Sequence, residues 1–478
     1  MAALAGRRAL RHARRRRVGA ALAASKVGGA AIIARPPFRL KRVWSGRKRR
    51  QTGHNGNFTR LPKSFMSFQP RVLVCLASEQ IMQNALPALR LRPARVVIAA
   101  SDGEAAYRGA SQVSRVLQKA GWAEDAVRIV RHTPDHDLGR ISSYARELAA
   151  ALSREFPGWP IDLNASGGTK VMSFGFLGAF AGLGDAWYCD THHDLLEPLG
   201  GGAALALPPD MLRLSDLLQM QGYRVVADPT WSADFARAAA ARAFLTEHLA
   251  CSASQLGGFF GYVNRLTREV LPKTRPDGAV VRAFQSEIVA ERPLFANHHQ
   301  LAWAFEQAGI WQWDGDCHFA FANETVARYA GGGWLEEWVW LTLAGLQADG
   351  QIPDGHWGTS VSIDAEGAVE GVGNELDAAL VWRNRLLVLE CKTGVQITTE
   401  GGSQAILNRL DSLRRHVGGA MGETWLLTAR RLHPGTGSAA RERARAYSIR
   451  LIEPEQLADL RSDVEHWMHV DGASHASS

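Results

Sequence analysis

Three charged side chains stand close to two apolar runs in the C-terminal part of the chain. In the stretch NELDAALVWRNRLLVLECKTG, β-strands are predicted on either side of Arg383 and Asn384. If these two residues form a hairpin turn, Asp377 faces Glu390, with Cβ atoms about 4.5–5.5 Å apart on one face of the sheet. Lys392 lies on that same face because side chains alternate along a strand. The spacing therefore predicts that two carboxylates and one amine converge.

Two carboxylates at this separation repel each other by roughly 3 kcal/mol at an effective dielectric near 20. A cation or a shared proton between them removes that cost. An oxygen-only ligand set favours Mg²⁺ or Mn²⁺ over Zn²⁺, so the stretch predicts a divalent-metal site. The turn is the weak element, because Arg-Asn lacks the glycine that two-residue turns prefer, and a one-residue slip would separate the carboxylates. The alternative is a surface ion pair between Glu390 and Lys392.

A third carboxylate is predicted on the helix that begins within GGGWLEEWVWLTL. Glu336 shares a helical face with Trp340 and Leu343, at i+4 and i+7, which turns it toward the interior. Glu337 lies beside it, and periodicity alone does not separate the two. The helix is expected to add one carboxylate oxygen to the metal site.

A second stretch, DLNASGGTKVMSFGFLGAF, has the features of an anion-binding turn. A predicted strand ends at Asn164, a Gly-Gly turn follows, and an apolar helix begins near Thr169. Glycines let the backbone approach a ligand, and a helix N-terminus offers free N–H groups to an anion. Because the G-x-x-x-x-G-K-[ST] spacing is absent, this is not a Walker A loop. The alternative is a tight turn that needs glycine for its geometry only. The residues expected to contact a phosphate are Asn164, Ser166, Gly167, Gly168, Thr169 and Lys170.

The elements that position this turn alternate between strand and helix. Such alternation predicts an α/β fold with a largely parallel, doubly wound sheet, ending near Asp228. Ligands bind beyond the carboxyl ends of the strands in such sheets, where the glycine turn lies. Strands are predicted at 71–76, 94–101, 126–130, 160–166 and 186–191, and helices at 83–91, 111–121, 141–156 and 169–183.

The rest of the chain divides into further units. Residues 229–330 are mostly helical by pattern and contain a helix followed by a hairpin signal at Asp314-Gly315. This combination is similar to a winged helix, although a connector is favoured over a DNA reader. Residues 331–470 form the unit with the carboxylates, and 471–478 form a tail.

Composition limits the function classes. The 478 residues suffice for two or three domains, and no apolar run is long enough to span a membrane. Five scattered cysteines without C-x-x-C spacing argue against a disulfide framework and structural zinc, and are typical of a reducing cytoplasm. The cluster YCDTHHD resembles a metal site, but an ordinary polar loop is the favoured interpretation.

The basic charge comes from the first 65 residues, which hold 18 Lys or Arg and no Asp or Glu. The remaining chain has 37 basic and 47 acidic residues, so its formal charge of −10 does not favour general nucleic-acid coating. The leader is typical of a transit peptide, a nucleic-acid-binding tail or a translated upstream region with the functional start at Met66. The last interpretation is preferred.

The glycine turn resembles a known signature, Asn-x-(Ser/Thr)-Gly-Gly-Thr-Lys-x-Met, of CARF domains. These domains sense cyclic oligoadenylate in type III CRISPR systems. The first loop, with Ser78, Glu79 and Gln80 after the first strand, is also similar, as is WYCDT at residues 187–191. The resemblance implies that Ser78 and Gln80 bind the nucleotide together with the residues of the glycine turn.

The carboxylates resemble the PD-(D/E)xK nuclease superfamily. The matching residues are Glu336 on the first helix, Asp377 on one strand, and Glu390 and Lys392 on its partner. The resemblance implies that Glu336, Asp377 and Glu390 hold the metal, which polarises the scissile phosphate and activates water. Lys392 would position the water and offset developing charge.

Together, residues 66–478 resemble the CARF–nuclease effectors of type III CRISPR defence, including at GGGWLEEWV and LDSLRRHVGG. The fold implied is a Rossmann-like CARF domain plus a restriction-endonuclease-like domain. The function implied is a cytoplasmic homodimer that binds cyclic tetra-adenylate and degrades nucleic acid with Mn²⁺ or Mg²⁺. Its substrate would be single-stranded DNA or RNA, or supercoiled duplex DNA. The alternatives are a CARF regulator with an inactive C-terminal domain, and a nuclease that answers to another nucleotide or to none.

Overall fold

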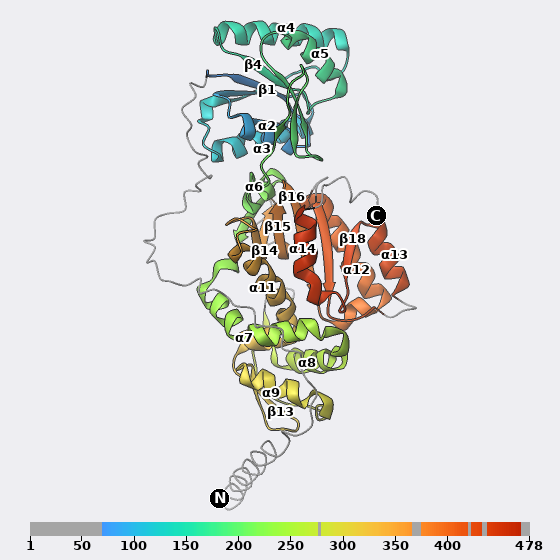
Figure 1. The fold of residues 1–478 in the computed structure, drawn as a ribbon. Helices are drawn as coiled ribbons and strands as arrows, with labels where there is room; N and C mark the ends of the chain where they lie inside the picture. The colour runs from blue at the N-terminus through green and yellow to red at the C-terminus, as the bar shows by residue number, and fades with distance from the viewer. Residues whose placement is uncertain (1–68, 276–278, 366–373, 419–421, 433–436, 470–478) are drawn as a thin grey trace, which may run out of the picture. The chain divides into compact units, whose positions relative to one another are not determined.

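A computed structural model of the chain describes residues 69–275, 279–365, 374–418, 422–432 and 437–469 (Figure 1). The predicted leader, residues 1–65, and the predicted tail, residues 471–478, lie outside the described residues. Within the described part of the chain, no helix is both long and apolar enough to cross a membrane.

The first sheet of the described chain has seven strands and is mostly parallel. Its strands are β1 (Val72–Leu76), β2 (Arg95–Ala99), β3 (Val127–Val130), β4 (Ile161–Asn164), β5 (Ala186–Asp190), β6 (Leu195–Pro198) and β7 (Leu205–Ala206). The order is β3-β2-β1-β4-β5-β6-β7, in which β1 to β5 run parallel and β6 and β7 return antiparallel. The predicted parallel sheet is confirmed, and β6 and β7 extend it.

Helices cover both faces of this sheet (Figure 1). They are α2 (Met82–Leu91), α3 (Glu104–Lys119), α4 (Leu138–Glu155) and α5 (Lys170–Phe180). Along β1, Leu73 packs in the core with α2 and α3, whereas Val72 and Val74 pack with α4 and α5. The α3 helix begins at Glu104 rather than at residue 111, because its first turns carry few large apolar residues that could reveal the period.

The second sheet carries the predicted carboxylates. Its strands are β8 (Tyr223–Ala227), β14 (Trp357–Ala365), β15 (Asn374–Trp382), β16 (Arg385–Lys392), β17 (Gly422–Thr428) and β18 (Ile449–Ile452). The order is β18-β17-β16-β15-β14-β8, with antiparallel pairing from β8 to β16 and parallel pairing from β16 to β18. The helices around it are α6 (Leu214–Met220), α11 (Trp334–Ala348), α12 (Glu400–Leu413), α13 (Ser438–Ala446) and α14 (Leu460–His469).

The predicted register of the β15–β16 hairpin is confirmed. Trp382 pairs with Arg385 and Ala378 with Leu389, as a two-residue turn requires. Arg383 and Asn384 adopt φ angles of 50° and 57°, the left-handed conformation of a type I′ turn. The turn therefore forms without glycine, and Asn tolerates this region better than most residues.

The strand β8 precedes the predicted boundary near Asp228 but belongs to the second sheet. It pairs antiparallel with β14, through Ala227 with Ser362 and Tyr223 with Ala365. Strand pairing thus divides the two sheets between β7 and β8. A short alternating run indicates a strand but not its partner, so the sequence could not place it.

The segment between β8 and β14 is mostly helical and holds two small sheets, β10-β9 and β11-β13-β12. Its helices are α7 (Ala233–Cys251), α8 (Gly257–Val270), α9 (His299–Gln307) and α10 (Glu324–Arg328), and its strands are β9 (Lys273–Thr274), β10 (Val280–Arg282), β11 (Glu287–Val289), β12 (Trp311–Trp313) and β13 (His318–Phe321). The hairpin expected at Asp314-Gly315 joins β12 and β13, and Gly315 has a φ of 86°. Phe260 of α8 stacks on Trp334 of α11, so this segment shares a core with the second sheet.

Candidate functional site

The three predicted side chains meet at the end of β16. Lys392 Nζ lies 2.6 Å from Glu390 Oε1 and 3.4 Å from Asp377 Oδ2. The backbone N–H of Cys391 donates to Asp377 Oδ2 at 2.7 Å, which fixes the aspartate at the strand end. Glu390 is 1% exposed, so the cluster is not the surface ion pair considered above.

The charges in this cluster perturb one another. Burial, followed by the Asp377 carboxylate, raises the pKa of Glu390. Burial opposes the ammonium of Lys392, but the two carboxylates outweigh it and raise the pKa of this lysine. Glu390 Oε2 is buried without a hydrogen-bond partner in the described residues. An unpartnered buried carboxylate oxygen is costly and suits a site that takes a cation.

The two helix glutamates have different environments. Glu337 is 1% exposed and forms a buried ion pair with Arg242 of α7. Glu336 is half-buried, and its pKa is raised to about 7 by burial and then by Asp377. The structure thus brings Glu336 into electrostatic contact with the cluster and engages Glu337 elsewhere.

Glycines allow the start of α11 to approach the end of β16. A Cβ at Gly332 would lie 2.4 Å from Thr393 Oγ1, and Gly332 has a φ of 144°. This φ favours glycine, and a Cβ at this position would force the Thr393 side chain or the backbone to move. The glycine break before WLEEWV therefore allows a close approach of the two segments.

The fit to a divalent metal is chemical rather than geometric. As the side chains stand, the described residues contain no group of three or more His, Cys, Asp or Glu side chains that could hold a metal ion. Lys392 instead bridges Glu390 and Asp377. The donor set is nevertheless all oxygen, and Glu390 Oε2 has no hydrogen-bond partner within the described chain. Glu336, Asp377 and Glu390 are therefore the residues that could hold a divalent cation.

Sequence reasoning missed one residue of this site. Arg409 of α12 lies 3.4 Å from Glu390 Oε1 through Nη2, with its side chain 57% exposed. Helical periodicity marks Arg409 only as an exposed position, so no local signal connects it with β16.

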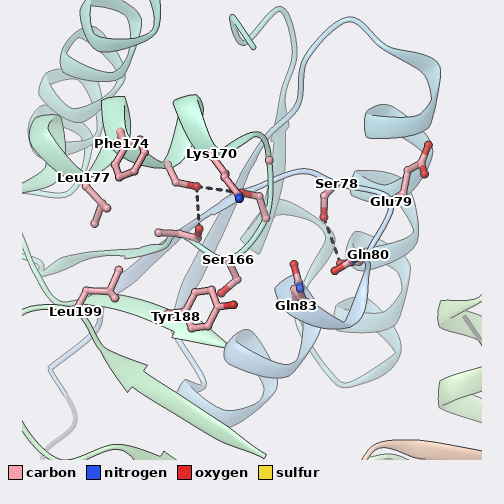
Figure 2. Close-up of a pocket in the computed structure, with 14 residues that line it drawn as sticks. Ser78, Glu79, Gln80, Gln83, Ser166, Lys170, Phe174, Leu177, Tyr188 and Leu199 are labelled. Atoms are coloured by element: carbon pink, nitrogen blue, oxygen red, sulfur yellow. Dashed lines mark hydrogen bonds between the residues drawn. The ribbon is translucent and has the colours of Figure 1, made fainter. Parts of the chain in front are cut away.

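The glycine turn borders a pocket of about 620 Å³ on the first sheet (Figure 2). The residues that line it are Ser78, Glu79, Gln80, Gln83, Ala165, Ser166, Gly167, Gly168, Lys170, Ser173, Phe174, Leu177, Tyr188 and Leu199. Figure 2 shows polar side chains such as Ser78 and Gln83 on one side and Phe174, Leu177 and Leu199 on the other. Its polar and apolar sides suit a ligand that has both charged and aromatic groups.

Two predicted pocket residues have other positions. Asn164 is fully buried, and its Nδ2 donates to Asn84 Oδ1 at 2.9 Å while its Oδ1 accepts from Ser166 Oγ at 2.6 Å. It therefore braces the turn from behind rather than lining the pocket. Thr169 accepts a hydrogen bond from Met172 N, which caps α5, and it lines an adjacent pocket of about 280 Å³.

The glycine at position 167 is required by space. A Cβ there would lie 2.0 Å from the carbonyl oxygen of Leu76, and Gly168 has a φ of 68°. The backbone of the turn therefore lies directly against the end of β1. Lys170, the first residue of α5, is exposed at the mouth of the pocket.

The apolar side of the pocket was missed by sequence reasoning. Phe174 is 69% exposed, and Tyr188 and Leu199 are 44% and 47% exposed. The signal was available in α5, whose apolar residues continue around the helix instead of forming one stripe.

The cluster YCDTHHD holds a loop together, because Asp190 accepts hydrogen bonds from the backbone N–H groups of His192 and His193.

Comparisons with known proteins identify the domain in which the Lys392 cluster lies. Residues 323–471 match the Card1-like endonuclease domain. The predicted resemblance to CARF-domain nucleases is confirmed for this domain, and the Card1-like domain contains all four predicted catalytic residues. No curated protein matches the chain significantly.

Two solved structures share the fold over most of the chain. Protein VC1899 from Vibrio cholerae has a TM-score of 0.66 at 23% identity, covering 83% of this chain and 98% of its own. Can2 from Sulfobacillus thermosulfidooxidans, solved with cyclic tetra-adenylate, has a TM-score of 0.61 at 19% identity, covering 84% of this chain and 100% of its own. The predicted two-part α/β architecture is thereby confirmed.

Proposed function

We propose that the protein is a metal-dependent nuclease of type III CRISPR defence that cyclic oligoadenylate activates. The main support for a nuclease function is that Lys392 lies 2.6 Å from Glu390 and 3.4 Å from Asp377 within the Card1-like domain. The PD-(D/E)xK assignment rests on this arrangement together with Glu336 on α11.

Each residue of the cluster has a role in this proposal. Glu336, Asp377 and Glu390 would hold Mn²⁺ or Mg²⁺, which supplies polarisation of the scissile phosphate and acidification of the attacking water. Lys392 keeps its ammonium charged next to two carboxylates. It is therefore suited to orient the water and to offset negative charge that develops on the phosphate.

The activator is proposed to bind the pocket of the first sheet. Lys170 and the N-terminus of α5 offer positive charge to a phosphate, and the turn at Gly167 allows close approach. Tyr188, Phe174 and Leu199 can contact adenine rings. Cyclic tetra-adenylate is the proposed ligand, since the related Can2 structure contains it. Because this ligand has two-fold symmetry, two copies of the chain would share it as a homodimer.

No observation favours the regulator as a second candidate, and the contacts of Lys392 with Glu390 and Asp377 support the nuclease. The decisive experiment is a cleavage assay with Mn²⁺, with and without cyclic tri-, tetra- or hexa-adenylate. Substrates should include single-stranded and supercoiled duplex DNA and single-stranded RNA. Cleavage that needs both Mn²⁺ and one of the cyclic ligands supports the proposal. Ligand binding without cleavage of any substrate would instead favour the regulator.

A further inference from the structure

The resting position of Arg409 is set by the packing of α12. Leu407 and Leu410 of this helix are fully buried in the same core as Leu386 and Val388 of β16. Arg409, between these leucines in sequence, leaves the core and reaches the end of β16. The backbone of Arg409 is therefore held near the end of β16 by a packed helix rather than by a loop.

The negative charge of Glu390 is already balanced without Arg409. Lys392 already lies 2.6 Å from the same oxygen, Oε1, whereas the arginine is 3.4 Å away. The Arg409 side chain is 57% exposed, and an ion pair this accessible to water contributes little to stability. Within the described chain, the only ion pair recorded for Arg409 is this one. Most of its donors thus face solvent.

The surroundings make such a cation useful to a nuclease. Outside the first 65 residues the chain has a formal charge of −10, which repels a nucleic-acid strand as a whole. Local cations must then guide the strand to the carboxylates. A planar guanidinium with five donors matches phosphate geometry in a way that a single ammonium does not.

We propose that Arg409 is a substrate-binding residue that holds a backbone phosphate of the nucleic acid next to the scissile bond. In the resting protein its guanidinium rests on Glu390 Oε1, and it turns to the phosphate when substrate enters. This inference rests on the proposed nuclease function and adds a residue outside the four that the motif predicts.

The test compares Arg409→Ala with Arg415→Ala in the full chain with cyclic tetra-adenylate. Arg415 is the matched control, because it follows the same helix, is 66% exposed and pairs with Asp411. Binding of a labelled single-stranded oligonucleotide is measured by fluorescence anisotropy in Ca²⁺, at several salt concentrations. We expect Arg409→Ala to weaken binding about tenfold and to lower the salt-dependence slope by about one phosphate contact. Arg415→Ala should stay within about twofold of wild type.

Cleavage in Mn²⁺ provides the second readout. Arg409→Ala should raise KM about tenfold with a smaller effect on kcat, and Arg409→Lys should recover part of the loss. The increase in Tm on adding Mn²⁺ should be unchanged, which separates substrate binding from a role in the metal site. Equal oligonucleotide affinity for Arg409→Ala and wild type would overturn the inference even if wild type cleaves. Absence of cleavage by wild type under all conditions would instead overturn the nuclease function itself.

Discussion

Glu337 and Arg242 form a buried ion pair, and this pair distinguishes the two adjacent glutamates of α11. Arg242 Nε donates to both carboxylate oxygens of Glu337 at 3.0 Å, and Thr246 Oγ1 donates to Oε1 at 2.7 Å. The guanidinium also lies 4.1 Å from the ring centroid of Tyr329. Glu337 is engaged in this pair, whereas burial and then the Asp377 carboxylate of β15 raise the pKa of Glu336.

The ion pair predicts that a change at Arg242 affects mainly stability, whereas a change at Glu336 affects mainly cleavage. Arg242→Ala leaves a buried carboxylate without its partner, so it should lower the free energy of unfolding by about 3–5 kcal/mol in urea denaturation. Glu336→Gln should abolish cleavage with a much smaller effect on stability. A stable Arg242→Ala variant would show that this pair does not hold α11 in place.

The proposed metal site predicts a coupled loss of metal binding and cleavage. Mn²⁺ should raise the Tm of wild type, because a ligand that binds only the folded state stabilises it. Asp377→Asn and Asp377→Ala should lose both this shift and cleavage, whereas binding of cyclic tetra-adenylate, measured by calorimetry, should remain. Full cleavage by Asp377→Ala would contradict the catalytic assignment.

Lys170 is expected to act in activation only. Lys170→Ala removes an exposed cation at the mouth of the pocket, so more cyclic tetra-adenylate should be needed for half-maximal cleavage, by about tenfold. Arg154→Ala is the control. Arg154 is also an exposed cation, but it lies in the last turn of α4 and does not line the pocket. The Mn²⁺-induced Tm shift should be the same in both variants. A similar activator requirement in the two variants would remove Lys170 from the ligand site.

The turn between β15 and β16 provides a test of coupling. Arg383 Nε lies 2.8 Å from Asp194 Oδ2, and Asn384 Nδ2 lies 3.4 Å from Oδ1. Asp194 follows β5, which carries the pocket residue Tyr188. The double variant R383N/N384G forms the preferred Asn-Gly type I′ turn but lacks both contacts. Because Asp194 is buried and loses these partners, the variant should be less stable than wild type. At a temperature where it is folded, it should bind cyclic tetra-adenylate yet show weaker stimulation of cleavage. Unchanged stimulation would mean that the activation signal does not pass through this turn.

The buried thiols predict how cysteine labelling and protein stability depend on pH. Burial raises the pKa values of Cys75 and Cys189 to about 12, whereas Cys251 is exposed. Because the thiolate is the reactive form, native protein at pH 8 should react quickly at Cys251 and slowly at Cys75 and Cys189. These two thiols stay neutral in the folded state, so they should contribute to a loss of stability only as pH rises above about 8.5 toward 12. Mass spectrometry of labelled peptides checks the first expectation, and fast labelling of Cys75 would contradict the burial of β1.

Local sequence was enough to predict the central features of both candidate sites. A two-residue turn fixed the register from Trp382 with Arg385 to Ala378 with Leu389, because hairpin register depends on neighbouring residues only. Asp377 and Glu390 are the next residues of the two strands, and both contact Lys392. The Gly-Gly turn was recognisable for a similar reason, since glycine marks the close approach that Gly167 makes to β1.

Only the tertiary structure decided which residues share these sites. Glu336 and Glu337 are adjacent on one helix. Arg242 of α7 forms an ion pair with Glu337, which distinguishes it from Glu336. Arg409 contacts Glu390 because α12 packs on β16. Asn164 lies behind the pocket because its side chain donates a hydrogen bond to Asn84. The strand β8 joins the second sheet through its pairing with β14. Each of these contacts joins residues far apart in sequence, and their packing leaves no trace in the local period of apolar residues.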